Sequence, residues 1–163
     1  PSVASAQELG LTPVMTLGAP LTSVKVIEEG TPASYGGTWQ APSRRWVGLV
    51  PLGYGDGILR AASNGAPVAV ETDSGLVKAQ IVGRICMDQF IIDLGPAEGQ
   101  EGTATQNSGS APAKVGDQAI LFGDPAKGYP IADEWAAHAG TINYEVITRL
   151  GERIPRQYVN EEE

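Results

Sequence analysis

The chain has 163 residues, of which 42% are hydrophobic and 18% are charged, and its formal net charge is −8. This length suits one domain with a buried core, because domains usually hold about 100–200 residues. No apolar run approaches the roughly 20 residues of a membrane-spanning helix, and the acidic balance disfavours a nucleic-acid partner. One cysteine and one histidine exclude an internal disulfide and a metal site built from several such side chains. We therefore expect a single soluble domain over 1–163, cytoplasmic and without a signal peptide or metal.

Short apolar segments separated by turns fill most of the chain, which contains 21 Gly and 12 Pro. Alternating apolar and polar residues with many β-branched side chains are typical of strands, and short strands at this spacing indicate a sandwich or barrel. The longest segment, 84–94, is compatible with one central strand or with two strands joined at Asp88-Gln89. Strands are predicted at 14–17, 21–27, 46–52, 66–70, 77–82, 84–94 and 117–122.

The segment 97–114 interrupts this pattern and contains no large apolar residue. A segment of this composition cannot bury enough surface to offset the entropy lost on ordering. We therefore predict a flexible loop inserted in the fold, after which the strand pattern resumes at 117–122.

The last third of the chain changes to a helical period. A helix is predicted over 131–139, ended by Gly140, which suits the left-handed backbone common at helix C-termini. A second helix is predicted over 142–150, with Thr141 as its N-cap and apolar residues at i, i+4 and i+8. Residues 153–159 are then expected to return as an extended edge segment.

Side chains that commonly carry catalysis are sparse. His138 lies alone at the end of an Ala-rich helix, so a surface or capping role is favoured. Cys86 lies among apolar residues in a predicted strand and is interpreted as a small hydrophobic residue. Asp56 and Asp88 could form a carboxylate pair, but such aspartates more often form turns. The sequence contains neither a Gly-x-Ser-x-Gly elbow nor a Gly-x-x-x-x-Gly-Lys phosphate loop.

Three tyrosines are better candidates for chemistry. Tyr35 and Tyr54 each lie at a bend that glycines permit, and Tyr144 lies in the first turn of the second predicted helix, away from its apolar stripe. A tyrosine can act as acid or base when nearby cations lower its pKa, which is about 10 in water. Composition alone favours the simpler interpretation that all three are amphipathic surface residues.

Several short motifs, taken together and in order, resemble the C-terminal β-domain of the bacterial alanine racemase family. The similarity extends from about residue 13 to 158, and it is specific because the motifs also keep compatible spacing. The motifs are Pro-Val-Met-Thr-Leu at 13–17, Ser-Tyr-Gly-Gly-Thr-Trp at 34–39, Pro-Leu-Gly-Tyr-Gly-Asp-Gly at 51–57, Val-Gly-Arg-Ile-Cys-Met-Asp-Gln at 82–89, Gly-Thr-Ile-Asn-Tyr-Glu at 140–145 and Arg-Ile-Pro-Arg at 153–156.

The resemblance implies a mainly β, barrel-like domain with two short helices near its C-terminus, in an enzyme that interconverts L- and D-alanine for cell-wall peptidoglycan. In that family an N-terminal (β/α)₈ barrel holds pyridoxal phosphate on a lysine. Two subunits pair head to tail, so that each C-terminal domain completes the partner's active site. The chain has no counterpart of that barrel, and none of its lysines lies in the family's cofactor-lysine motif. We therefore expect it to be inactive alone and to act with its own barrel domain and a second subunit.

The resemblance also implies roles for individual residues. Tyr35 matches the catalytic tyrosine, the acid/base on the L-alanine face opposite the lysine. Met87 matches the residue whose main-chain N–H helps hold the substrate carboxylate, and Tyr54 matches a tyrosine that narrows the entrance. Tyr144 matches the tyrosine that contacts the cofactor phosphate in its own subunit. Two arginines match positions along the substrate corridor, namely Arg60 and Arg84.

Two departures and two alternatives accompany the resemblance. Gly18 stands where an arginine is common in the family, and the 97–114 insertion is longer than usual. One alternative is a related pyridoxal-phosphate enzyme, either a decarboxylase or a racemase of broader specificity; the motifs at 34–36 and 141–144 argue against a decarboxylase. The other alternative is a non-enzymatic interaction module whose tyrosines and glycine loops form a docking face.

Overall fold

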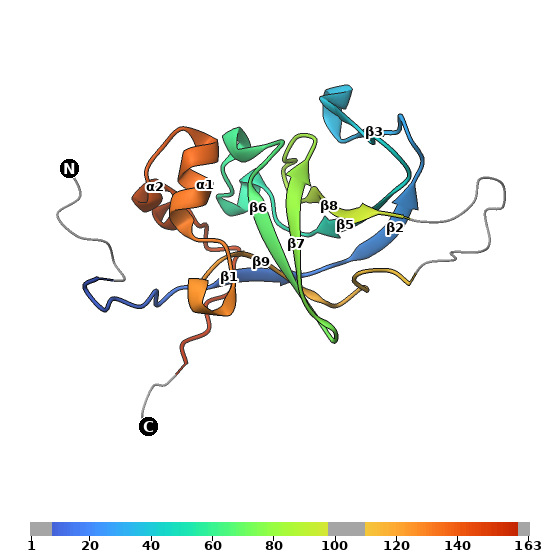
Figure 1. Ribbon diagram of the computed structural model, residues 1–163. Coiled ribbons are helices and arrows are strands. Elements are labelled where there is room, and N and C mark those ends of the chain that lie inside the picture. The colour runs from blue at the N-terminus through green and yellow to red at the C-terminus, as the bar shows by residue number, and fades with distance from the viewer. Residues whose placement is uncertain (1–7, 98–109, 160–163) are drawn as a thin grey trace.

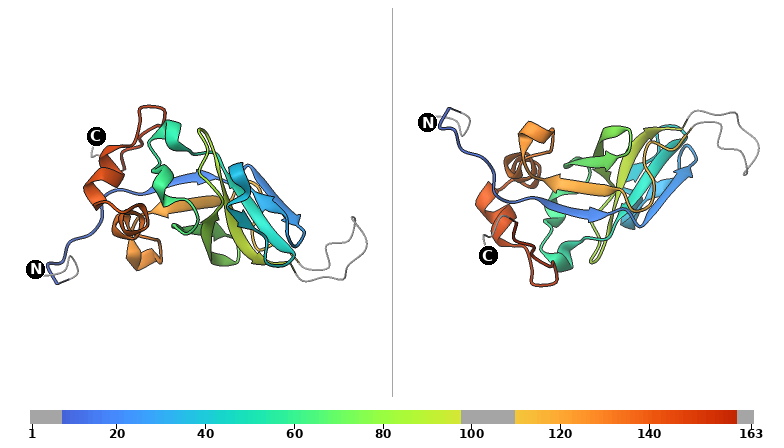
Figure 2. Two further views of the ribbon diagram at one scale, coloured as in Figure 1. Left: turned by 90° about the horizontal axis from the view of Figure 1, so that it is seen from above. Right: turned by 90° about the horizontal axis from the view of Figure 1, so that it is seen from below.

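The structure, a computed structural model, describes residues 8–97 and 110–159, and its main feature is an antiparallel sheet of seven strands (Figure 1). The strand order is β1-β9-β6-β7-β8-β5-β2, so that β1 and β2 form the two edges. Only Leu21 and Thr22 separate these strands in the chain, a link that reaches at most about 11 Å. The sheet therefore curls until its edges approach each other (Figure 2). The strands are β1 Leu17–Pro20, β2 Ser23–Ile27, β5 Arg45–Val50, β6 Pro67–Thr72, β7 Gly75–Val82, β8 Phe90–Pro96 and β9 Gln118–Phe122.

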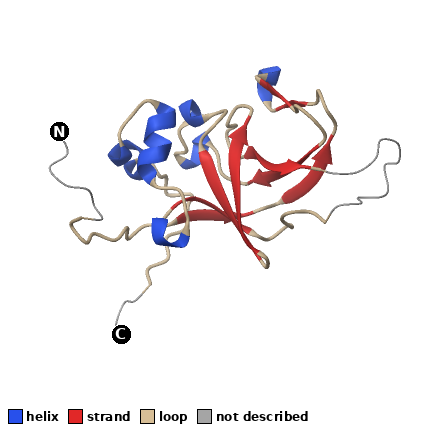
Figure 3. Cartoon of the chain, viewed as in Figure 1, coloured by secondary structure: helices blue, strands red, loops and turns tan. Residues whose placement is uncertain are grey.

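Two short helices pack beside one end of this sheet (Figure 3). α1 spans Ala132–Ala139 and ends at Gly140, whose φ of +69° is the predicted left-handed C-terminus. α2 spans only Asn143–Thr148, and Ile142 occupies its N-cap position. The predicted cap Thr141 lies one residue earlier, and its hydroxyl donates to the Glu145 carboxylate and accepts no helix N–H. The curled sheet and the two helices confirm the predicted mainly β, barrel-like fold.

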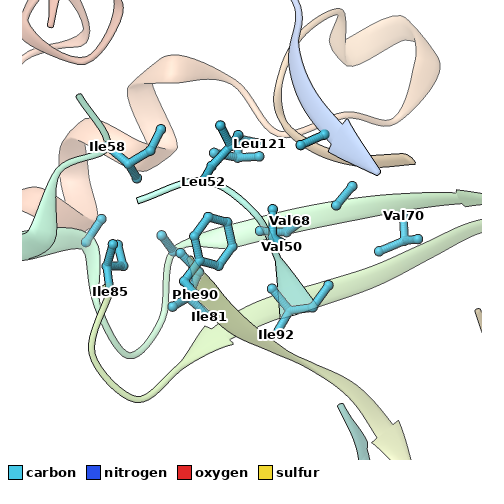
Figure 4. Close-up of a cluster of buried hydrophobic side chains, with 14 of the residues drawn as sticks. Val50, Leu52, Ile58, Val68, Val70, Ile81, Ile85, Phe90, Ile92 and Leu121 are labelled. Atoms are coloured by element: carbon cyan, nitrogen blue, oxygen red, sulfur yellow. The ribbon is translucent and has the colours of Figure 1, made fainter. Parts of the chain in front are cut away.

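The hydrophobic core fills the inside of the curled sheet and continues beneath the helices. Side chains alternate along β7, so that polar Lys78 and Gln80 are exposed and Ile81 is buried in the core. Trp135 of α1 is 1% exposed and donates its indole N–H to the Pro67 carbonyl at 3.0 Å, which fixes the helix against β6. Figure 4 shows the central cluster, which includes Val50, Leu52, Ile58, Val68, Val70, Ile81, Ile85, Phe90, Ile92 and Leu121.

The first strand differs from the prediction. β1 starts at Leu17, where the predicted strand 14–17 ended, and it includes the Gly-Ala-Pro segment at 18–20, which lies between the predicted strands 14–17 and 21–27. Pairing with β9 explains the shift, because a Cβ on Gly18 would lie 2.7 Å from Ile120 Cδ1, and an edge strand tolerates Pro20. The glycine at position 18 therefore has a packing reason of its own.

The predicted segment 84–94 is strand only in its second half, as β8. Gly83, with a φ of +72°, directs the chain into a turn that extends to Gln89 before β8 begins. Cys86 lies in this turn, half-buried, and not in the predicted strand.

Two further predictions concern the later part of the chain. Residues 153–159 form no strand, since 152–154 form a turn and the rest stay outside any ladder. Of the predicted loop 97–114, residues 98–109 lie outside the described part of the chain. Ala97 and Ala113, near its two ends, are buried in the core.

Candidate active site

Four turns on the same side of the sheet carry most of the predicted site residues (Figure 1). The short hairpin of β3 Pro32–Ala33 and β4 Trp39–Gln40 carries Tyr35 in the 3-10 turn η1 Tyr35–Gly37. After β5, the turns η2 Tyr54–Asp56 and η3 Arg60–Ala62 carry Tyr54 and Arg60. The fourth of these turns is residues 83–89, between β7 and β8, which carries Arg84 and Met87. The remaining 3-10 turn, η4 Pro125–Lys127, precedes α1 and carries no predicted site residue.

Tyr35 is held by its backbone while its side chain remains 71% exposed. Ser34 Oγ donates to the Arg84 carbonyl at 2.6 Å and lies 3.3 Å from Cys86 Sγ. On the other side of Tyr35, a Cβ on Gly36 would lie 2.6 Å from Arg84 Nη1, so the guanidinium packs directly on this bend. The phenol thus projects from a bend that is attached to the 83–89 turn on both sides.

The Tyr54 turn is joined to the same turn by backbone hydrogen bonds. Tyr54 N–H donates to the Cys86 carbonyl at 3.0 Å, and Gly55 N–H donates to the Met87 carbonyl at 2.8 Å. Gly53 permits this approach, since a Cβ there would lie 2.3 Å from both carbonyl oxygens. Within the described residues, no backbone or side-chain acceptor binds the Met87 main-chain N–H.

Asp56 and Asp88, considered above as a carboxylate pair, share Arg153 between them. Asp56 is 5% exposed; its Oδ2 accepts from Gly53 N–H at 2.8 Å, and its Oδ1 lies 3.1 Å from Arg153 Nε. Arg153 Nη2 donates to Asp88 Oδ1 at 2.5 Å. The hydrogen bond to Asp88 and the charge of Asp56 raise the pKa of Arg153. The two aspartates therefore hold the site turns in place and are not arranged as an acid–base pair.

Arg60 is exposed on η3, and the residues after it attach this turn to the others. Ser63 Oγ accepts from Ile85 N–H at 3.0 Å, and Asn64 Oδ1 accepts from Gly83 N–H at 2.7 Å. Asn64 also donates to Thr38 Oγ1 in the Tyr35 hairpin at 3.1 Å. The structure thus gathers the turns of Tyr35, Tyr54, Arg60, Arg84 and Met87 into one hydrogen-bonded group.

Tyr144 does not belong to this group. It is 68% exposed on α2, and Figure 1 shows α2 and the β3–β4 hairpin toward opposite ends of the molecule. His138, in the last turn of α1, is exposed, which agrees with its interpretation as a surface residue.

A depression of about 300 Å³ lies beside the Tyr35 bend, where a small molecule could reach it. Within residues 8–97 and 110–159, no three His, Cys, Asp or Glu side chains lie close enough to hold a metal ion. In the same residues, every helix is too short or too polar to cross a membrane. The depression is lined by Ser34, Tyr35, Leu49, Cys86, Gln89, Phe90 and Ile91.

Sequence reasoning singled out the tyrosines, Met87 and the arginines as candidates, but it gave no role to the residues that hold their turns. Ser34 and Arg153 were included in motifs without a role. Their partners lie 50 and 65 residues away in the chain, and no local pattern reveals such contacts.

Comparison with known proteins gives a consistent family. The chain matches the family model "Alanine racemase, C-terminal domain" over residues 14–158. It is 45% identical over 161 residues to alanine racemase of Streptomyces coelicolor, covering 99% of this chain and 37% of that protein. It is 43% identical over 149 residues to alanine racemase of Thermobifida fusca, covering 91% of this chain and 35% of that protein.

Solved structures agree with this result. The fold matches alanine racemase from Streptomyces coelicolor with a TM-score of 0.82 and 43% identity, over 99% of this chain and 37% of that one. It matches biosynthetic alanine racemase from Pseudomonas aeruginosa with a TM-score of 0.77 and 34% identity, over 98% of this chain and 38% of that one. The chain therefore spans little more than a third of the length of these relatives.

Proposed function

The chain belongs to the family of alanine racemase C-terminal domains, and on this premise we propose that it forms that domain of a pyridoxal-phosphate-dependent enzyme interconverting L- and D-alanine. One observation carries the proposal beyond family membership. The Tyr35 phenol is exposed on a bend attached to the 83–89 turn, and the free main-chain N–H of Met87 lies in that same turn. One group of hydrogen-bonded turns therefore holds both a proton carrier, the Tyr35 phenol, and a hydrogen-bond donor for the substrate carboxylate, the Met87 N–H.

Each predicted site residue has a task in this proposal. Tyr35 removes or returns the Cα proton on the L-alanine face, and the Met87 N–H binds the substrate carboxylate. Tyr54 narrows the entrance, and its backbone link to Cys86 keeps it beside Met87. Charged groups along the corridor attract and orient the substrate carboxylate; these are Arg60 and Arg84.

The cofactor would be held mainly by the rest of the whole protein. When bound, pyridoxal phosphate withdraws electrons from the substrate's Cα, which makes loss of the proton possible. In this chain, the exposed Tyr144 hydroxyl fits a phosphate oxygen as a hydrogen-bond donor. We infer that this chain has no racemase activity without the rest of the protein.

The separation of the two tyrosines supports a head-to-tail dimer. Since α2 and the β3–β4 hairpin lie toward opposite ends, Tyr35 and Tyr144 of one chain suit two different sites (Figure 1). Tyr35 then completes the partner subunit's site, and Tyr144 serves the site of its own subunit. Supply of D-alanine for peptidoglycan and a cytoplasmic location belong to the same proposal.

The test replaces Tyr35 in the whole protein and measures racemisation in both directions. Tyr35→Phe keeps the ring and removes the proton carrier, so activity should fall roughly 10²–10⁴-fold. Tyr158→Phe is the matched control, because Tyr158 is equally exposed, at 72%, but lies outside the site turns. Full activity of the Tyr35→Phe protein would contradict the proposed role.

Subunit mixing tests the contribution to the partner. Tyr35→Phe protein is mixed with protein that lacks the cofactor lysine, and the subunits are allowed to exchange. If Tyr35 acts in the partner subunit's site, one of the two active sites in each heterodimer has both the lysine and Tyr35. About half of the dimers in an equimolar mixture are heterodimers, so activity recovers to about a quarter of the unmodified level. If Tyr35 acts within its own subunit, mixing restores nothing.

A further inference from the structure

The residue before Tyr35 has an unusual backbone. Ser34 has a φ of +61° and a ψ of −171°, a combination that is essentially restricted to glycine. Asn64, the other non-glycine residue with positive φ in residues 8–97 and 110–159, has a φ of +56°, and asparagine tolerates the left-handed region. A serine remains in this conformation only when its surroundings hold it there.

The hydroxyl of Ser34 supplies the holding contact. Its Oγ donates to the Arg84 carbonyl at 2.6 Å in a half-buried position, and it also lies 3.3 Å from Cys86 Sγ. Gly83 faces Ser34 and leaves room for it, because a Cβ on Gly83 would lie 2.8 Å from Ser34 Cβ and 2.5 Å from the Ala33 carbonyl oxygen. The bend and the 83–89 turn therefore pack closely at Ser34, with no room for a side chain at position 83.

The direction of Tyr35 depends on this bend. The ψ of Ser34 sets the path of the chain into Tyr35, and the exposed ring has little packing of its own to fix its direction. We propose that Ser34 is a positioning residue for the phenol of Tyr35: its hydroxyl holds the strained bend that aims the proton carrier. This inference rests on the proposed function, since it concerns the geometry of that same proton transfer.

The test uses the whole protein with Ser34→Ala and Ser34→Gly. Ser34→Gly adopts the observed backbone without strain, so folding is not at risk, and it removes only the tether. Ser34→Ala removes the tether and retains the strain. Misplacement of a reacting group by about 1 Å can cost 10²-fold in rate, so we expect kcat to fall about 10–100-fold in both variants.

Isotope effects identify which proton transfer has slowed. The equilibrium between the two enantiomers is fixed, so kcat/KM falls in both directions together. With Cα-deuterated L-alanine, whose proton Tyr35 removes, the isotope effect should rise in both variants. With Cα-deuterated D-alanine, whose proton is removed on the opposite face before the slowed transfer, it should not rise, and it falls if removal of that proton limits the unmodified enzyme. A merely structural weakening would not produce this asymmetry.

Ser63→Ala is the matched control, since Ser63 Oγ also binds the 83–89 turn but is remote from Tyr35 in the chain. It should lower thermal stability and leave both isotope effects at their unmodified values. An isotope effect with deuterated L-alanine that stays at the unmodified value, or an unchanged kcat, would overturn the inference. If Tyr35→Phe abolishes activity while the Ser34 variants keep it, the positioning role alone fails. If Tyr35→Phe keeps activity, the proposed function itself fails.

Discussion

Asp56 offers a quantitative test of how the site turns are held together. Its carboxylate accepts from Gly53 N–H at 2.8 Å and pairs with Arg153 Nε at 3.1 Å, while its side chain is only 7% exposed. In Asp56→Asn, the single amide oxygen serves only one of these donors. If it faces Gly53, the amide NH₂ is turned toward the guanidinium, and two donors oppose each other.

The expected cost follows from burial. A hydrogen bond to a charged group contributes about 1.5–3 kcal/mol, so we expect Asp56→Asn to lower the free energy of unfolding by about 2 kcal/mol. Asp88→Asn removes the second partner of the same arginine, with the two side chains 60% and 55% exposed. An ion pair of that exposure contributes about 0–1 kcal/mol.

Urea denaturation followed by far-ultraviolet circular dichroism measures both changes. The pair of variants is informative because each removes one partner of Arg153; they differ in the burial of that partner and in the Gly53 N–H bond that only Asp56 accepts. The reasoning is refuted if Asp88→Asn costs as much as Asp56→Asn. It is also refuted if Asp56→Asn leaves the unfolding free energy unchanged.

Two more predictions concern the scaffold. Trp135→Phe leaves the Pro67 carbonyl without its 3.0 Å donor and opens a cavity, so the unfolding free energy should fall by about 2–4 kcal/mol in the same urea assay. The pKa of Tyr129 is raised to about 12 because its hydroxyl donates to the Glu71 carboxylate. The folded state thus holds this proton more tightly than the unfolded state, so this contribution to stability is complete below pH 10 and is lost as pH rises toward 12.

Each of these has a control that separates it from general damage. Trp39→Phe removes a half-exposed indole and should change the unfolding free energy by less than about 0.5 kcal/mol. Tyr129→Phe should remove the loss of stability between pH 10 and 12, measured as urea midpoints across that range. A profile unchanged by this substitution would assign the loss to other groups.

The elements that local pattern determines were predictable from the sequence. Alternation predicted β7, and the glycine after the Ala-rich segment predicted the end of α1 at Gly140. The position of β1 was not predictable, because it depends on pairing with β9, which lies about 100 residues later in the chain. The apolar segment 84–94 was misleading for a similar reason: Gly83 and contacts with Ser34 make its first half a turn.

The same distinction applies to the site. Motifs were sufficient to propose roles for Tyr35, Tyr54 and Met87, because the family resemblance lies in their immediate neighbours. Ser34 and Arg153 lie in those motifs too, yet their contacts come from other turns. A role that consists of holding another segment becomes visible only when both segments are placed in space.

The exposure of the site residues also has a physical implication. Tyr35, Met87 and Tyr144 are each more than half exposed, although burial of such side chains is favourable. The backbones of the Tyr35 and Met87 turns are nevertheless rigidly joined by hydrogen bonds and close glycine contacts. Rigid backbone beneath large exposed side chains lowers the entropic cost of covering them with another surface. These features favour a domain whose working surface is completed by other parts of the enzyme, as the proposed arrangement of barrel and partner subunit requires.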